Sequence, residues 1–314
     1  MKAGARDAGR LGARIWGRAA GLTAIDHLTV AIPLAWLLVF LALPIAAVAA
    51  LAIHPLRDSI PPVGPLFTMV DGHPAFHGTT RALRLVLTDG LYLHAFTSAL
   101  VNAALTALAC VAIGFPFAYA IARAPARHRH FYVLLAVLPF WTSFLLRAYA
   151  WIGMLRDSGP LNGALLSLGL IERPLPILYS PAAVLLVMVY SYLPFFVLPM
   201  YAVLEKLPAD LLAAAADLGA RPWYVFRTVT VPLSFAGIAS GAILVFVPAL
   251  GEYVIPELVG NSDTLMIGGI LWDEFFQNRD WPLAATIALY TFGLLMVPAL
   301  LLRRWLVQLG GFAR

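Results

Sequence analysis

The sequence predicts an all-α integral membrane protein with six transmembrane helices. Hydrophobic residues make up 61% of the 314 positions and charged residues only 12%, whereas a soluble domain carries about 25% charged residues. No water-facing fold of this size can hide so much apolar surface, so the excess must face lipid. Six apolar stretches are long enough to cross a bilayer as helices, which takes about 20 residues each.

The six expected spans follow one another without a second soluble domain. The first could instead be a signal peptide, because basic residues precede it, but its apolar run from Leu28 to Ile53 is too long for one. We therefore expect a basic cytoplasmic tail at 1–28, a single transmembrane domain at 29–304 and a cytoplasmic tail at 305–314. The expected spans lie near 29–53, 95–121, 131–155, 181–204, 233–255 and 283–302.

The distribution of basic residues predicts the orientation. With the N-terminus inside, 14 of the 21 Lys and Arg residues lie in inside segments and 6 in outside segments, and Arg147 lies within the third span. The positive-inside rule then places both termini in the cytoplasm. The net charge of +5 thus indicates a membrane flank and not a nucleic-acid partner. The single cysteine, Cys110, cannot form an intramolecular disulfide and is expected to be a small buried residue.

The inside loop at 205–232 has the pattern of two short helices. Asp210 can cap the start of an Ala- and Leu-rich helix, Gly219 suits its end, and Pro222 suits the first turn of a second helix. Small residues let another backbone approach, and the aromatic side chains that follow Pro222 can fill a groove. From the pattern alone, the loop either docks onto a partner protein or lies on the inner leaflet as an amphipathic helix.

The same loop resembles the signature of the permease subunits of binding-protein-dependent ABC importers. That signature reads Glu-Ala-Ala, three residues, Gly, nine residues, Ile-x-Leu-Pro. Here it is Ala213-Ala214-Ala215, then Gly219, then Val229-Thr230-Val231-Pro232. The resemblance implies the type I importer fold and a coupling helix between spans four and five that is seated in an ATPase subunit. The residues it implicates are Asp210, Ala213, Ala214, Ala215, Asp217, Gly219, Ala220, Phe226 and Pro232.

One residue departs from that signature. Ala213 stands where the family has glutamate, so the usual carboxylate contact is absent or is supplied by Asp210 or Asp217. The resemblance also implies partners: a second homologous permease, two ATPase subunits that hold ATP and magnesium, and a periplasmic binding protein. It implies the bacterial inner membrane as the location, with no cofactor in this chain.

Further stretches resemble the polyamine (putrescine/spermidine) permeases of the same family. They are residues 146–153, 251–258, 266–268 and 272–282. The resemblance implies import of a small cation, and permeases for opines, thiamine or ferric iron, which share the fold, stay open as alternatives.

A polyamine needs carboxylates for its ammonium groups and aromatic faces for its methylenes. Aromatic residues near span ends are also ordinary interface anchors, and acidic loop residues are usually just solvated. Glu252 stands out, because an ionisable group inside an apolar span is expensive, and Arg147 either pairs with a carboxylate such as Glu252 or snorkels outward. The candidate pathway residues are Trp141, Tyr149, Trp151, Tyr190, Tyr192, Glu252, Tyr253, Asp273 and Glu274.

Several motifs are missing from the sequence. It has no G-x-x-x-x-G-K-[ST], and its only lysines, Lys2 and Lys206, do not follow glycine, so we expect no ATP site and no enzyme activity here. His73 and His77 flank Pro74, which makes a metal site improbable. An ion-coupled secondary transporter is the main rival, but such chains usually show two related halves. Gly237 and Gly241 form a G-x-x-x-G, for which packing within the chain is the simpler interpretation.

Overall fold

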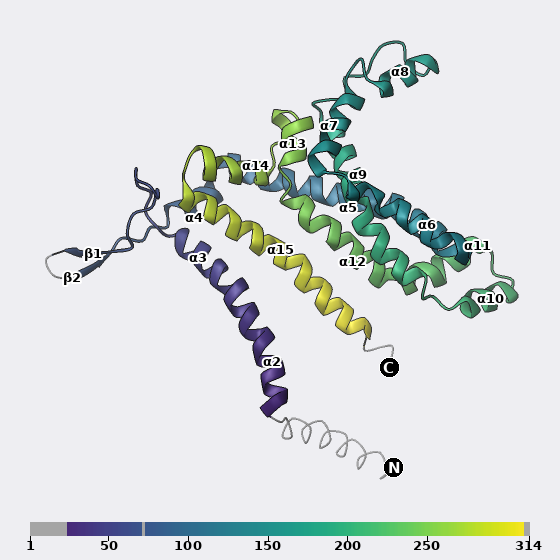
Figure 1. Cartoon of the computed structure of the whole chain (residues 1–314), viewed down its shortest axis with the longest axis horizontal. Helices are drawn as coiled ribbons and strands as arrows, with labels where there is room; N and C mark the ends of the chain where they lie inside the picture. The colour runs from purple at the N-terminus through teal and green to yellow at the C-terminus, as the bar shows by residue number, and fades with distance from the viewer. Residues whose placement is uncertain (1–23, 71–72, 311–314) are drawn as a thin grey trace, which may run out of the picture. The chain divides into compact units, whose positions relative to one another are not determined.

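The computed structural model describes residues 24–70 and 73–310, which are mostly helical with one small β-hairpin (Figure 1). Of the predicted terminal tails, residues 1–23 and 311–314 lie outside the described residues. Contacts divide the chain into two units, Met1–Leu51 and Ala52–Arg314, and each is described by itself.

The first unit contains one long apolar helical stretch. Helix α2 (Ala24–Leu37) continues through a π-helical turn (Leu38–Ala42) into α3 (Leu43–Leu51). The stretch Thr29–Leu51 is long and apolar enough to cross a membrane, and the side chains of residues 29–44 are all exposed. A helix that is apolar on every face is typical of a lipid-facing span.

Three long helices form the core of the second unit. They are α5 (Gly90–Arg123), α9 (Pro181–Leu204) and α12 (Val231–Leu250), which pack against one another. On α5, alanine recurs at every fourth position from Ala95 to Ala107, and each of these alanines is buried. This spacing places small side chains on one face, where they let neighbouring helices approach closely in lipid. The expected burial of Cys110 on the same helix is confirmed.

Phe196 of α9 shows how closely the three helices approach. A Cβ added to Gly114 of α5 would lie 2.5 Å from the Phe196 ring, and one added to Gly241 of α12 would lie 2.8 Å from it. A Cβ at Gly237 would lie 3.0 Å from the Val203 side chain of α9. The G-x-x-x-G therefore serves packing within the chain, as the sequence analysis preferred.

The third predicted span, 131–155, is not one continuous helix. Helix α6 (Ala126–Val137) passes into a 3₁₀ turn (Leu138–Trp141), and α7 (Phe144–Leu155) begins after two residues, with the two helical segments bent by 90°. Pro139 lies in the turn and lacks an N–H, which favours a break. The Thr142 hydroxyl donates a hydrogen bond to the Pro139 carbonyl oxygen at 2.8 Å.

Shorter elements surround the core. Strands β1 (Phe67–Val70) and β2 (His73–Phe76) pair antiparallel, with Phe67 opposite Phe76. This hairpin and helix α4 (Arg81–Thr88) lie in the segment 56–90, for which the sequence analysis expected a loop. The other short helices are α8 (Pro160–Ser167), α10 (Ala209–Asp217), α11 (Pro222–Val225), α13 (Val254–Val259) and α14 (Ile267–Trp272).

The number of spans is only partly settled. Within the described residues, four helices are long and apolar enough to cross a membrane, and the bent pair would make a fifth. The last helix, α15 (Trp281–Gly310), covers the sixth predicted span, 283–302. The count of six stays a prediction.

Candidate functional site

The loop at 205–232, which we name the coupling loop, connects the C-terminal end of α9 to the start of α12. Helix α10 ends at Asp217, and Gly219 has a φ of +76°, a left-handed conformation that favours glycine. The Ala220 N–H then donates to the Ala215 carbonyl at 3.2 Å. Helix α11 begins at Pro222 and runs through a π-helical turn (Phe226–Thr230) into α12.

Most of the coupling loop faces outward. Asp210, Ala213, Ala214 and Asp217 are exposed, while Ala215 and Ala220 are half-buried. Large apolar side chains accompany them: Leu218 is 88% exposed, Trp223 70% and Tyr224 64%. Exposed apolar side chains gathered on one loop are characteristic of an interaction surface.

The end of the coupling loop is anchored by aromatic contacts. The Phe226 ring lies edge-on to Phe115 at 5.5 Å and to Tyr119 at 6.1 Å between ring centroids, and both partners belong to α5. Trp223 stacks on Phe226 at 5.4 Å. Pro232 follows the π-helical turn within this continuous helix, and because it has no N–H it donates no hydrogen bond to a preceding carbonyl. A displacement of the loop would therefore also move α5 and α12, to which it is attached.

Glu252 lies at the opposite end of α12 and not inside a span as expected. Helix α12 ends at Leu250, followed by Gly251, and α13 starts only at Val254. The Glu252 side chain is 8% exposed, and its Oε1 accepts the N–H groups of Tyr253, Val254 and Ile255 at 3.1, 2.9 and 3.3 Å. The Tyr192 hydroxyl donates to Oε2. Glu252 therefore caps the start of α13, which explains how its charge is tolerated.

Tyr253 and Trp272 form an aromatic wall beside this cap. Their rings stack at 4.9 Å with an interplanar angle of 12°. A cavity of about 210 Å³ adjoins the wall and is otherwise lined mainly by apolar groups of Ile267, Gly268 and Leu271. A Cβ at Gly268 would lie 2.5 Å from the Gly251 carbonyl oxygen, so glycine is needed for α14 to approach. We name Tyr192, Glu252, Tyr253 and Trp272 the outer corner.

The other predicted pathway residues do not all join the outer corner. Trp151 and Tyr190 form a separate edge-on pair at 5.2 Å. Trp141 and Tyr149 are 77% and 59% exposed, as interface anchors would be.

The two acidic pathway candidates of the 272–282 stretch, Asp273 and Glu274, accept hydrogen bonds from different side chains. Glu274 is buried and accepts hydrogen bonds from the Tyr92 hydroxyl and the Asn278 amide, each at 3.0 Å. Asp273 is half-buried, and its carboxylate accepts a hydrogen bond from the nearby Gln277 side chain. Sequence reasoning did not include Trp272 or Tyr92 among the site residues. Trp272 is the first residue of the stretch 272–282 that resembles polyamine permeases, so that resemblance could have indicated it. No motif near Tyr92 in the sequence indicates a functional role.

The suggested pairing of Arg147 with Glu252 is wrong. The Arg147 guanidinium lies over the rings of Phe140 and Phe144, at 5.8 and 5.7 Å from the ring centroids. In the part of the chain that the structure describes, the ion pairs are Arg81–Asp280 and Arg129–Glu205. The Glu252 carboxylate accepts instead the three N–H groups that follow it and the Tyr192 hydroxyl.

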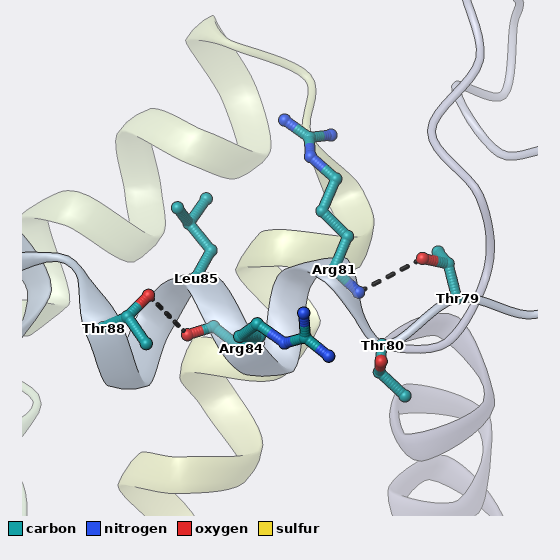
Figure 2. A pocket seen from close by; sticks show the side chains of 6 residues that line it. All are labelled: Thr79, Thr80, Arg81, Arg84, Leu85 and Thr88. Carbon is teal, nitrogen blue, oxygen red and sulfur yellow. Dashed lines mark hydrogen bonds between the residues drawn. The ribbon is translucent and has the colours of Figure 1, made fainter.

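A second cavity, of about 390 Å³, lies beside α4 (Figure 2). Arg81 and Arg84 line it together with Thr79, Thr80, Leu85 and Thr88. The Thr79 hydroxyl accepts the Arg81 N–H, and the Thr88 hydroxyl donates to the Arg84 carbonyl. Arg81 is paired with Asp280, but the described lining of this cavity contains Arg84 and no carboxylate, so the cavity is unsuited to a cationic solute.

Comparison with known proteins decides the family. The family described as binding-protein-dependent transport system inner membrane component matches residues 27–309. This chain belongs to that family. The permease is therefore a transport subunit of the inner membrane with several membrane-spanning helices, which excludes the secondary-transporter alternative.

The permease has well-matched relatives. It is 39% identical over 203 residues to the spermidine/putrescine transport system permease protein PotB of Escherichia coli (strain K12), which covers 65% of this chain and 74% of the relative. It is 33% identical over 278 residues to the protein of the same name from Haemophilus influenzae, covering 88% and 91%. The resemblance to polyamine permeases is thus confirmed.

Two solved structures share the fold of the permease. The crystal structure of a bacterial ABC transporter involved in alginate import matches with a TM-score of 0.65 at 17% identity, covering 93% of this chain and 99% of that one. A second, an alginate ABC transporter in complex with an alginate pentasaccharide-bound periplasmic protein, matches with a TM-score of 0.67 at 16% identity, covering 88% and 92%.

Proposed function

We propose that this permease imports a polyamine, putrescine or spermidine, as one subunit of an ATP-driven transporter. The observation that carries the proposal is the match to the Haemophilus influenzae relative, a spermidine/putrescine permease that aligns over 91% of its length. A match over nearly the whole chain includes both the coupling loop and the outer corner, which are the two regions where energy and solute would enter.

The outer corner offers chemistry that suits a flexible diamine or triamine. The stacked faces of Tyr253 and Trp272 can pack against methylenes and attract an ammonium group by cation–π interaction. Glu252 is not free to bind a cation, because four hydrogen bonds already occupy its carboxylate. Asp273 is the better candidate, since it follows Trp272 in the chain and is half-buried, with its carboxylate bonded to the Gln277 side chain.

The assembly would contain a second, homologous permease, two ATPase subunits that bind ATP and magnesium, and a periplasmic binding protein. The coupling loop would lie on the cytoplasmic side, six spans would cross the membrane, and both termini would be inside. The exposed Leu218, Trp223 and Tyr224 support docking of this loop onto a partner protein. The basic residues of the coupling loop, Lys206, Arg221 and Arg227, support its cytoplasmic orientation.

The mechanism follows from where the coupling loop is attached. When the ATPases close on ATP, they would displace α10 and α11, and the rigid connection through Phe226 would tilt α5 and α12. Tilting these core helices would open the pathway toward the periplasm, where the binding protein releases its cation.

Uptake by reconstituted transporter tests the proposal. The permease, its partner permease, the ATPase and the binding protein are placed in proteoliposomes with radiolabelled spermidine or putrescine outside. We expect ATP-dependent accumulation that requires the ATPase and is inhibited by the other polyamine but not by thiamine. Accumulation without ATP, or none of either polyamine, would overturn the proposal.

A further inference from the structure

The guanidinium group of Arg129 connects three helix ends. Arg129 lies in the first turns of α6, and its Nη1 donates to Glu205 Oε1 at 3.1 Å. Its Nη2 donates to the carbonyl oxygen of Ala124 at 3.2 Å. Ala124 is the capping residue that directly follows α5, and Glu205 is the capping residue that directly follows α9. One side chain therefore joins the ends of α5 and α9 to α6.

These contacts lie at the start of the coupling loop. The chain leaves α9 through a tight turn, in which the Lys206 N–H donates to the Val203 carbonyl and the Leu207 N–H to the Leu204 carbonyl. Helix α10 begins at Ala209, soon after Glu205. Phe226 anchors the other end of the loop to α5, so α5 is held at both ends of the loop, by a charged contact at one and by aromatic rings at the other.

The ion pair is too exposed to matter much for stability. The Arg129 and Glu205 side chains are 26% and 41% exposed, and exposed pairs contribute only about 0–1 kcal/mol. Both members of the pair nevertheless stay charged at neutral pH. Hydrogen bonds from Tyr201 and from Arg129 hold the pKa of Glu205 below its usual value of 4.5, so the carboxylate is ionised at neutral pH. Acidification breaks the pair only below that value.

We propose that Arg129 is a positioning residue for energy coupling: it makes the ends of α5, α6 and α9 move as one body when the coupling loop is displaced. The proposal rests on the proposed function, because it needs the loop to receive force from an ATPase. Without Arg129, the start of the loop could shift while α5 and α6 stay behind. ATP would then be hydrolysed without a matching movement of solute.

The test measures polyamine imported per ATP hydrolysed in proteoliposomes that contain the complete transporter. The single variants Arg129→Glu and Glu205→Arg place like charges together, and we expect each to lower this ratio at least about fivefold while the ATPase stays bound. The double exchange, Arg129→Glu with Glu205→Arg, restores the opposite charges and should bring the ratio back to within about twofold of wild type. Arg127→Glu is the matched control, since Arg127 lies exposed on the same helix.

Two results would overturn the proposal: single variants with the wild-type ratio, or a double exchange as impaired as the single variants. If a charge reversal prevents membrane insertion, Arg129→Gln, Glu205→Gln and their double variant give the same cycle, and additive effects on the ratio would count against the pair. Loss of ATPase binding in Gly219→Glu tests loop docking separately. If that variant keeps the ATPase and wild-type import, the proposed function of the loop fails and not merely the role of Arg129.

Discussion

The coupling loop and the outer corner lie at opposite ends of α12, and they use their side chains in opposite ways (Figure 1). The coupling loop leaves Leu218 and Trp223 exposed, and among the described residues no neighbouring atom lies within 4 Å of a Cβ added at Gly219. The outer corner buries a carboxylate and satisfies it with four hydrogen bonds. The coupling loop thus leaves large apolar side chains uncovered by the described part of this chain, whereas the outer corner satisfies its buried carboxylate with groups of its own.

The largest expected effect comes from a charged side chain at Gly219, which tests whether the coupling loop docks onto another protein. Gly219→Glu should abolish polyamine import and detach the ATPase, because no neighbouring atom of the described residues lies within 4 Å of the added Cβ, so the new side chain would obstruct the partner protein. The left-handed backbone adds about 1–2 kcal/mol of strain. Co-purification and uptake measure the effect. Gly219→Asn is the control, because asparagine tolerates this conformation, and its import should stay near wild type. Wild-type import by Gly219→Glu would refute docking.

The second prediction concerns the cap at Glu252. Glu252→Ala leaves three N–H groups and the Tyr192 hydroxyl without an acceptor, so we expect a loss of about 3 kcal/mol in the free energy of unfolding. Glu252→Gln keeps one acceptor and should cost about half as much. Thermal unfolding in detergent measures both. A variant of normal stability whose KM for polyamine rises about tenfold would show instead that Glu252 binds the solute.

The third prediction tests the aromatic wall. Trp272→Ala removes the ring that stacks on Tyr253 and should raise the KM for polyamine about fivefold, since a cation–π contact at an exposed ring contributes about 0.5–1 kcal/mol. Trp272→Phe should recover most of the affinity. Trp141→Ala is the matched control, because Trp141 is 77% exposed and lies in the 3₁₀ turn between α6 and α7. Equal KM values for Trp272→Ala and Trp141→Ala would remove the wall from the pathway.

The smallest expected effect belongs to Asp273. Asp273→Asn should raise the KM for polyamine about threefold, because a half-exposed charge contributes about 0.2–1 kcal/mol to attracting a cation. The effect should shrink as salt is added, since salt screens exposed charges. Glu257→Gln provides a comparison, as Glu257 is an exposed acid of the same stretch. An increase that persists unchanged in high salt would indicate a structural role for Asp273.

Local patterns in the sequence were enough for the coupling loop and for most helices. The left-handed Gly219, the start of α11 at Pro222 and the ends of α9 at 181 and 204 depend on neighbouring residues alone. The break of the third span was missed even though Pro139 was visible. A proline in an apolar stretch is often tolerated as a kink, and only the surrounding contacts decide between a kink and a 90° bend.

The contacts of the buried carboxylates, in contrast, could not be predicted from local sequence patterns. Tyr192 and Glu252 are 60 residues apart, and Tyr92 and Glu274 are 182 apart. No local pattern predicts which distant donor will reach a given carboxylate, so Glu252 could be read as a pathway residue when it is a helix cap. The same holds for Arg147, whose expected carboxylate is replaced by two phenylalanine rings of its own segment.

The sequence by itself determined the membrane class, the helical segments and the family signature, because hydropathy, helix ends and motif spacing are set by residues close together in the chain. The tertiary structure alone decided where the charged side chains are satisfied: Glu252 on α13, Glu274 beside Tyr92, and Arg129 across three helix ends. The physical reason is that an ion in an apolar fold needs partners at hydrogen-bond distance, and only folding brings them there.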